Sequence, residues 1–155
     1  MNHIKEIFSN LGIEPEYMEH EAVLTSEDAS KTRGFSLKQG IKALLFTCNN
    51  EWVVVDVPAD QKVNQKKVAE ILNWSKGKIR MATAEEVEEK TGCMIGAVPP
   101  FGHKEKIKIL VDEMIFDNDV SAFNIGLRTH SVNVKTELVK KVFDSLGVIW
   151  GDFVR

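Results

Sequence analysis

The chain has 155 residues, of which 43% are hydrophobic and 28% charged, and its formal net charge is −3 at pH 7. This length and composition predict one soluble globular domain over residues 1–155, with enough chain to bury a core. They exclude a membrane-spanning helix, because no apolar run approaches about 20 residues. They also argue against a generally basic protein that wraps duplex nucleic acid.

The amino terminus shows no sign of a secretory signal. Its first eight residues are amphipathic and of mixed charge, without an apolar core or a small-residue cleavage site. The two cysteines, Cys48 and Cys93, stand in contexts that do not suggest a disulfide. We therefore expect a protein of the reducing cytoplasm.

The first half of the chain predicts helices followed by a β-hairpin. In chain order the expected elements are a helix over residues 3–11, an extended piece over 17–20, a short helix from 25–28 to Gly34, and strands over 41–48 and 52–57. The helices are indicated by apolar side chains at helical spacing, by capping residues and by terminal glycines. The strands are apolar runs rich in β-branched residues, and they flank a short polar turn.

The second half predicts helices and strands in alternation. The expected elements are a helix over residues 64–72, a strand over 78–82, a helix over 83–92, strands over 107–111, 120–124 and 131–134, and a helix over 137–146. Asn64 and the capping box at residues 83–86 mark two of the helix starts. This order predicts an α+β (mixed α/β) domain with a mixed sheet of about six or more strands flanked by helices.

Lys42 is hard to explain by structure alone. Period-two alternation places it on the same strand face as Leu44 and Phe46. An amine on an apolar face is costly unless it is paired or faces a polar pocket. Two interpretations stay open: a lysine at a strand end that reaches water, or one that holds a carbonyl or phosphate oxygen of a ligand.

Residues 91–104 form a loop that contains three glycines and two prolines. Glycine allows positive φ and close approach of another chain, while proline fixes φ. The loop is therefore expected to be a rigid wall for a ligand. It is not a phosphate-binding loop, because its prolines lack amide donors and it has no Gly-Lys-Ser/Thr ending.

A cluster of basic residues lies between residues 61 and 80, where Glu70 is the one acidic residue. Its members are Lys62, Lys66, Lys67, Lys76, Lys78 and Arg80. A local basic face on an acidic protein fits a partner that presents a few phosphates, such as the end of a folded RNA. The alternative is an ordinary solvated helix face.

These features occur together in one known family. The motif Thr91-Gly92-x-x-Ile95-Gly96-x-Val98-Pro99-Pro100-x-Gly102-His103, Lys42 after Gly40, and His20-x-x-x-x-Thr25-x-Glu27-Asp28 resemble the YbaK / prolyl-tRNA synthetase-associated domain family. The segment Phe123-Asn124-Ile125-Gly126 resembles the late glycine motif of the same family. The likeness covers about residues 3 to 147.

The resemblance implies a barrel-like mixed sheet and a trans-editing hydrolase. Such an enzyme cleaves the ester between a wrong amino acid and the terminal adenosine of tRNA, most often on proline tRNA. Cysteine, alanine and serine all remain open as the amino acid removed. The implied partners are the acceptor end of aminoacyl-tRNA and prolyl-tRNA synthetase, with the protein as a monomer or homodimer. No metal or other cofactor is implied, and the histidines and cysteines show no zinc-type spacing.

The resemblance also implies the site. Lys42 would be the catalytic residue and would hold the substrate near its carbonyl or its 3′-terminal phosphate. The implied substrate-binding residues are His20, Thr25, Gly96, Ala97, Val98, Pro99, Pro100, Gly102, His103, Asn124 and Gly126. Backbone groups of residues 96–100 would contact the aminoacyl end, and Gly126 would let the adenosine approach. His103 is equally well explained as a residue that fixes the loop.

The sequence leaves other interpretations open. Cys93 is better explained as a packing residue than as a nucleophile, because no base is identifiable beside it. Hydrolysis could be assisted by a tRNA hydroxyl, by a substrate thiol or by a positioned water. The rival classes of protein are a non-catalytic module that binds tRNA or a synthetase, and a sensor of free amino acids.

Overall fold

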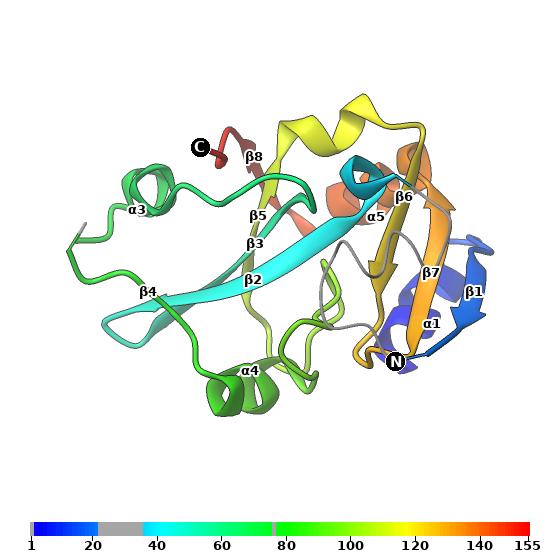
Figure 1. The fold of residues 1–155 in the computed structure, drawn as a ribbon, viewed down its shortest axis with the longest axis horizontal. Helices are drawn as coiled ribbons and strands as arrows, with labels where there is room; N and C mark the ends of the chain where they lie inside the picture. Colours follow the sequence, from blue (N-terminus) through cyan, green and yellow to red (C-terminus); the bar gives the residue numbers. More distant parts are fainter. Residues whose placement is uncertain (1, 22–35, 76) are drawn as a thin grey trace.

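The computed structural model describes residues 2–21, 36–75 and 77–155, and helices pack around strongly curved strands (Figure 1). The helices are α1 (Asn2–Asn10), α3 (Gln65–Leu72), α4 (Ala84–Thr91) and α5 (Thr136–Leu146), with 3-10 turns η1 (Leu37–Gln39) and η2 (Glu113–Asp117). The strands are β1 (Glu16–Glu19), β2 (Ile41–Cys48), β3 (Glu51–Pro58), β4 (Arg80–Met81), β5 (Lys108–Asp112), β6 (Val120–Asn124), β7 (His130–Lys135) and β8 (Ile149–Gly151). The short helix expected at residues 25–34 lies outside the described residues.

The strands form two sheets that meet at one point. A five-stranded sheet has the order β4-β2-β3-β5-β8, and a three-stranded sheet has the order β1-β7-β6. Pairing is antiparallel around β2 and β7, and parallel between β3, β5 and β8. A single parallel bridge between Gly40 and Ala122 joins the start of β2 to β6. The predicted mixed α+β fold with six or more strands is confirmed.

Local sequence signals account for several element ends. Asn49 and Asn50 both have positive φ (50° and 66°) in the turn between β2 and β3, which is the geometry of the tight turns preferred in hairpins. The Asn64 side chain caps α3 by accepting from two backbone amides. At α4, Thr83 and Glu86 form the expected capping box.

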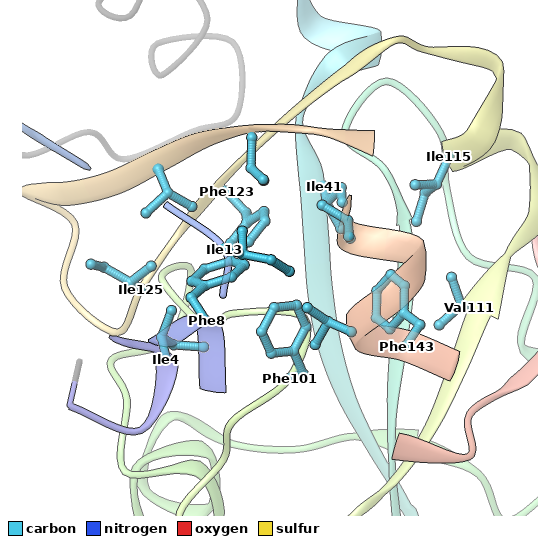
Figure 2. Packing of buried hydrophobic residues seen from close by; sticks show 14 residues of the cluster. Ile4, Phe8, Ile13, Ile41, Phe101, Val111, Ile115, Phe123, Ile125 and Phe143 are labelled. Carbon is cyan, nitrogen blue, oxygen red and sulfur yellow. The ribbon is translucent and has the colours of Figure 1, made fainter. Parts of the chain in front are cut away.

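The main core lies between the three-stranded sheet and the helices α1 and α5 (Figure 2). Phe101, from the glycine- and proline-rich loop, is fully buried in it. Its ring centroid lies 5.7 Å from those of Phe8, Phe123 and Phe143, each in an edge-on arrangement. Through this one side chain the loop is held against α1, β6 and α5, which restricts its movement.

The two faces of β2 pack against different parts of the chain. Leu44 and Phe46 belong to a cluster that includes α3 and the carboxyl-terminal segment. Ala43 and Leu45, on the opposite face, pack with Val98 of the loop. Residues 91–104 therefore lie under one face of β2 and close to the end of β6.

Candidate active site

Lys42 and Asn124 lie on the same face of the sheet, at the point where β2 and β6 separate. The parallel bridge pairs Gly40 with Ala122, and paired residues point to the same side. Since side chains alternate along a strand, the residues two positions further on, Lys42 and Asn124, share that side as well. Ile41 and Phe123 point the other way and both lie in the main core.

The environment of Lys42 is partly apolar. Its side chain is half-buried, and burial lowers the pKa of its amine, an effect that nearby Lys62 reinforces and that the carboxylate of Asp60 opposes. Within residues 2–21, 36–75 and 77–155 the amine has no hydrogen-bond or ion-pair partner. Its hydrogen-bonding capacity is thus left to a ligand or to water.

The loop is held at the end of β6 by side chains and by backbone. Asn124 Nδ2 donates to the carbonyl oxygen of Gly96 at 3.2 Å, and Arg128 Nη2 donates to that of Ile95 at 2.8 Å. The amide of Gly126 donates to the carbonyl of Ala97 at 2.9 Å. Gly96 itself has φ +83°, a conformation that only glycine adopts without strain. These bonds fix the position of the loop relative to the strand that carries Asn124.

Most of the loop's expected binding residues are buried. Ala97, Val98, Pro99 and Pro100 form its inner side, whereas Gly96 is exposed. Val98 packs against the face of β2 that carries Ala43. The exposed part of the 96–100 segment is therefore at its Gly96 end.

His103 and Cys93 have roles within the loop. His103 Nε2 donates to the carbonyl of Pro99 at 2.8 Å, and burial lowers the pKa of its imidazole to about 4, so the ring is neutral at pH 7. The Cys93 thiol donates to the carbonyl of Thr91 at 3.4 Å, and burial raises its pKa. This geometry favours loop fixing by His103 and packing by Cys93, since a thiol with raised pKa is a poor nucleophile.

The face that carries Lys42 and Asn124, here called the polar face, continues in a hydrogen-bonded pair formed by His20 and Ser131. His20 Nδ1 donates to the carbonyl of Glu21 at 2.8 Å, which leaves Nε2 to accept from the buried Ser131 hydroxyl at 3.0 Å. Ser131 is the direct partner of Asn124 across β6 and β7. Ser131 was not among the predicted site residues, because a lone serine in a strand carries no signal by itself. Thr25 lies outside the described residues.

The predicted glycines Gly102 and Gly126 line a cavity of about 430 Å³. Its other walls include His3 from α1, Lys104 from the end of the loop and Leu127 from the turn after β6. This size falls within the range of ligand pockets. Gly126 therefore lies between the polar face that carries Asn124 and this cavity.

The basic cluster is partly used within the protein. Lys67 Nζ bonds Asp152 at 2.7 Å and the carbonyl of Val154 at 2.9 Å. Arg80 bonds both carboxylate oxygens of Glu86, at 2.7 and 2.9 Å, which lowers the pKa of Glu86 to about 2. Three members remain exposed outside such pairs: Lys62, Lys66 and Lys78. Lys76 lies outside the described residues, and Figure 1 shows α3 and β4 at the end of the molecule away from β6 and β7.

The described residues offer neither a metal site nor a membrane-spanning helix. In the part of the chain that the structure describes, no three histidine, cysteine or acidic side chains are grouped as a metal site would require. Among the described helices, none combines the length and the apolar character that crossing a bilayer demands.

A half-buried lysine at the start of β2 and a glycine- and proline-rich loop that is hydrogen-bonded to the end of β6, on a mixed sheet, together characterise a class of protein. The chain belongs to the aminoacyl-tRNA editing domain family, whose pattern it matches over residues 20–142. It is thus a hydrolase of the aminoacyl-tRNA deacylase class, and its substrate is a charged tRNA.

Particular relatives agree with this assignment. The chain is 35% identical over 135 residues to the multifunctional Ser/Thr-tRNA deacylase ProXp-y of Escherichia coli strain K12, covering 84% of this chain and 80% of the relative. It is 29% identical over 132 residues to the proline–tRNA ligase of Brachyspira hyodysenteriae, of which it spans 22%. In fold it is similar to the crystal structure of a candidate trans-editing enzyme for prolyl-tRNA synthetase, with a TM-score of 0.85, 22% identity, and coverage of 99% of this chain and 96% of that one.

Proposed function

We propose that the protein removes serine and threonine from mischarged tRNA in the cytoplasm, with Lys42 and the Gly96 end of the loop at the reacting ester. The observation that carries the proposal is the polar face formed by Lys42, Asn124 and the His20–Ser131 pair beside the exposed Gly96. The named specificity of the Escherichia coli relative for Ser- and Thr-tRNA supports the same choice. Serine was already one of the three amino acids expected from the sequence.

Hydrolysis of the ester requires few catalytic groups from the protein. Water adds to the ester carbonyl, the bond from the carbonyl carbon to the ribose oxygen breaks, and that oxygen leaves with a proton. An enzyme accelerates this reaction by positioning the ester and by stabilising the negative charge that develops on the carbonyl oxygen. In our proposal the amine of Lys42 supplies that stabilisation, because it is half-buried and has no partner among the described residues.

The polar face supports a hydroxyl-bearing substrate. A surface that presents amide, imidazole and hydroxyl groups favours a side chain that can hydrogen-bond over one that offers only a methyl group. By this argument serine and threonine bind better than alanine. Cysteine is intermediate, because its thiol is a weak hydrogen-bonding group.

The test is a comparison of aminoacyl groups on one tRNA. Proline tRNA is charged separately with serine, threonine, alanine and cysteine, and the rate of ester loss is measured with and without purified protein. We expect serine and threonine to be released at least about tenfold faster than alanine, as loss of about one hydrogen bond would predict. Release of alanine or cysteine alone would contradict the proposed specificity, and binding without any release would contradict the activity.

A further inference from the structure

The cavity beside Gly126 is not accounted for by the aminoacyl site. It lies among the ends of the 91–104 loop, the turn after β6 and the start of α1. One rim is Gly126, whose amide bonds the loop at Ala97 and whose carbonyl accepts from Met94 at 3.3 Å. A ligand whose reacting end lies at Gly96 and which passes Gly126 would enter this cavity next.

Among the described residues that line the cavity, two carry side-chain nitrogen donors and none carries a carboxylate. Lys104 and His3 both line it. The Lys104 side chain lies directly over Gly92, since a Cβ on that glycine would be 3.2 Å from Lys104 Cβ. The neighbouring Glu105 is paired with Lys90 at 3.5 Å. The cavity therefore favours an anion of small size, such as a single phosphate group.

Exposed apolar side chains lie next to the cavity. Leu127 lines it and is 37% exposed, and Met94 and Ile95, which follow the lining residue Cys93 in the chain, are 45% and 40% exposed. The three residues lie close together because Met94 bonds to Gly126 and Ile95 bonds to Arg128. Gly126 and Arg128 are the two chain neighbours of Leu127. Three such side chains, next to a guanidinium and beside a glycine turn, form a small surface on which a flat base can lie.

We propose that this cavity and its rim bind the unpaired nucleotide that precedes the terminal adenosine of tRNA. Lys104 and His3 hold its phosphate, and its base lies against Leu127 and Met94. The inference rests on the proposed function, because it needs a charged tRNA whose ester lies at Gly96 and whose last nucleotides pass Gly126. A short hollow with two donors suits a single strand, whereas a duplex would need a longer basic face.

The test separates the tRNA end from the amino acid. The variants Lys104→Ala and Leu127→Ser are compared with the wild type, and Lys106→Ala serves as the control, since Lys106 is an exposed lysine of the same segment outside the cavity lining. Loss of one apolar contact with the base predicts a KM for seryl-tRNA about tenfold higher in Leu127→Ser, and we expect a similar rise in Lys104→Ala from loss of a phosphate contact. Because both contacts lie away from the ester, kcat should change little. A fall in kcat at constant KM, or variants that match the control, would overturn the proposal.

A binding measurement keeps this inference separate from the proposed function. Uncharged tRNA is titrated into the protein in two forms, complete and shortened by its last two nucleotides. The wild type should bind the complete tRNA more tightly, and Lys104→Ala should lose most of that difference while Lys106→Ala keeps it. Equal binding of the two forms by the wild type would overturn the inference. A wild type that discriminates between them but releases no amino acid would instead contradict the proposed function.

Discussion

Asp56 is the most unusual buried residue outside the site. It is fully buried on β3, and neither carboxylate oxygen has a hydrogen-bond partner in the described chain. Its ladder neighbours are Ala43 on β2 and Val111 on β5. Burial raises the pKa of this carboxyl well above its ordinary value, so the folded protein favours the protonated form.

The variant Asp56→Asn tests this description. Because the pKa is raised in the folded state, the stabilising effect of protonation is complete below the unfolded pKa of about 3.9 and is lost as the pH rises. Asparagine has nearly the same shape and cannot ionise, so its stability relative to the wild type should grow between pH 5 and pH 9. A gain of about 1 kcal/mol at high pH would raise Tm by about 2–4 °C. Thermal melts at several pH values provide the measurement, and parallel curves for the two proteins would contradict it.

Among the helices and strands, those defined by local chemistry could be predicted. The hairpin, the caps at Asn64 and Thr83 and the closing helix α5 all appear where the sequence predicted them. The strand expected over residues 78–82 is only Arg80–Met81, and β8 (Ile149–Gly151) was not predicted. Both are short edge strands that exist because they pair with β2 and β5. Such pairing depends on the whole fold and leaves little local signal.

Two glycines of the 91–104 loop allow a prediction about stability. Gly102 has φ +78°, and a Cβ there would lie 2.8 Å from the Cδ1 atom of the buried Ile4. Gly96 has φ +83°, but the nearest atoms to its Cβ position are those of the Arg128 guanidinium at 3.7 Å. We expect Gly96→Ala to cost about 1 kcal/mol of stability from backbone strain alone, and Gly102→Ala to cost more, because it also disturbs the core.

The effect of Gly96→Ala on activity should be larger than its effect on stability. Gly96→Ala should remain folded and lose deacylation, since Gly96 is the exposed end of the proposed ester site. Chemical denaturation and deacylation rates of both variants are the measurements needed. A Gly96→Ala protein with wild-type rates would contradict the place given to this residue.

At the scale of the whole molecule, the site depends on contacts that join distant parts of the chain. The bridge from Gly40 to Ala122 brings Lys42 and Asn124 to one face, and Phe101 fixes the loop in the main core on the other face of the same strands. The sequence indicated Lys42, the loop and Asn124 one by one. Their arrangement, the His20–Ser131 pair and the cavity with Lys104 required the register of β6 and β7.

The ion-pair partners of the basic cluster could not be predicted from the sequence either. The sequence indicated six cations with one acid among them, yet Lys67 pairs with Asp152, a residue 85 positions away. Arg80 is likewise occupied by Glu86. Charge patterning along the chain cannot reveal such partners, because they are neighbours only in the folded protein. A role for the exposed Lys62, Lys66 and Lys78 in tRNA binding remains a proposal.

The central claim is that Lys42 acts at the ester of a charged tRNA. Its most direct test is single-turnover release of serine from seryl-tRNA by the wild type and by Lys42→Ala, with Lys141→Ala, an exposed lysine of α5, as the control. We predict that Lys42→Ala lowers the rate by about 100-fold or more, as loss of a charge-stabilising group does elsewhere, with Tm unchanged within about 2 °C. A folded Lys42→Ala protein that releases serine at the wild-type rate would contradict the account.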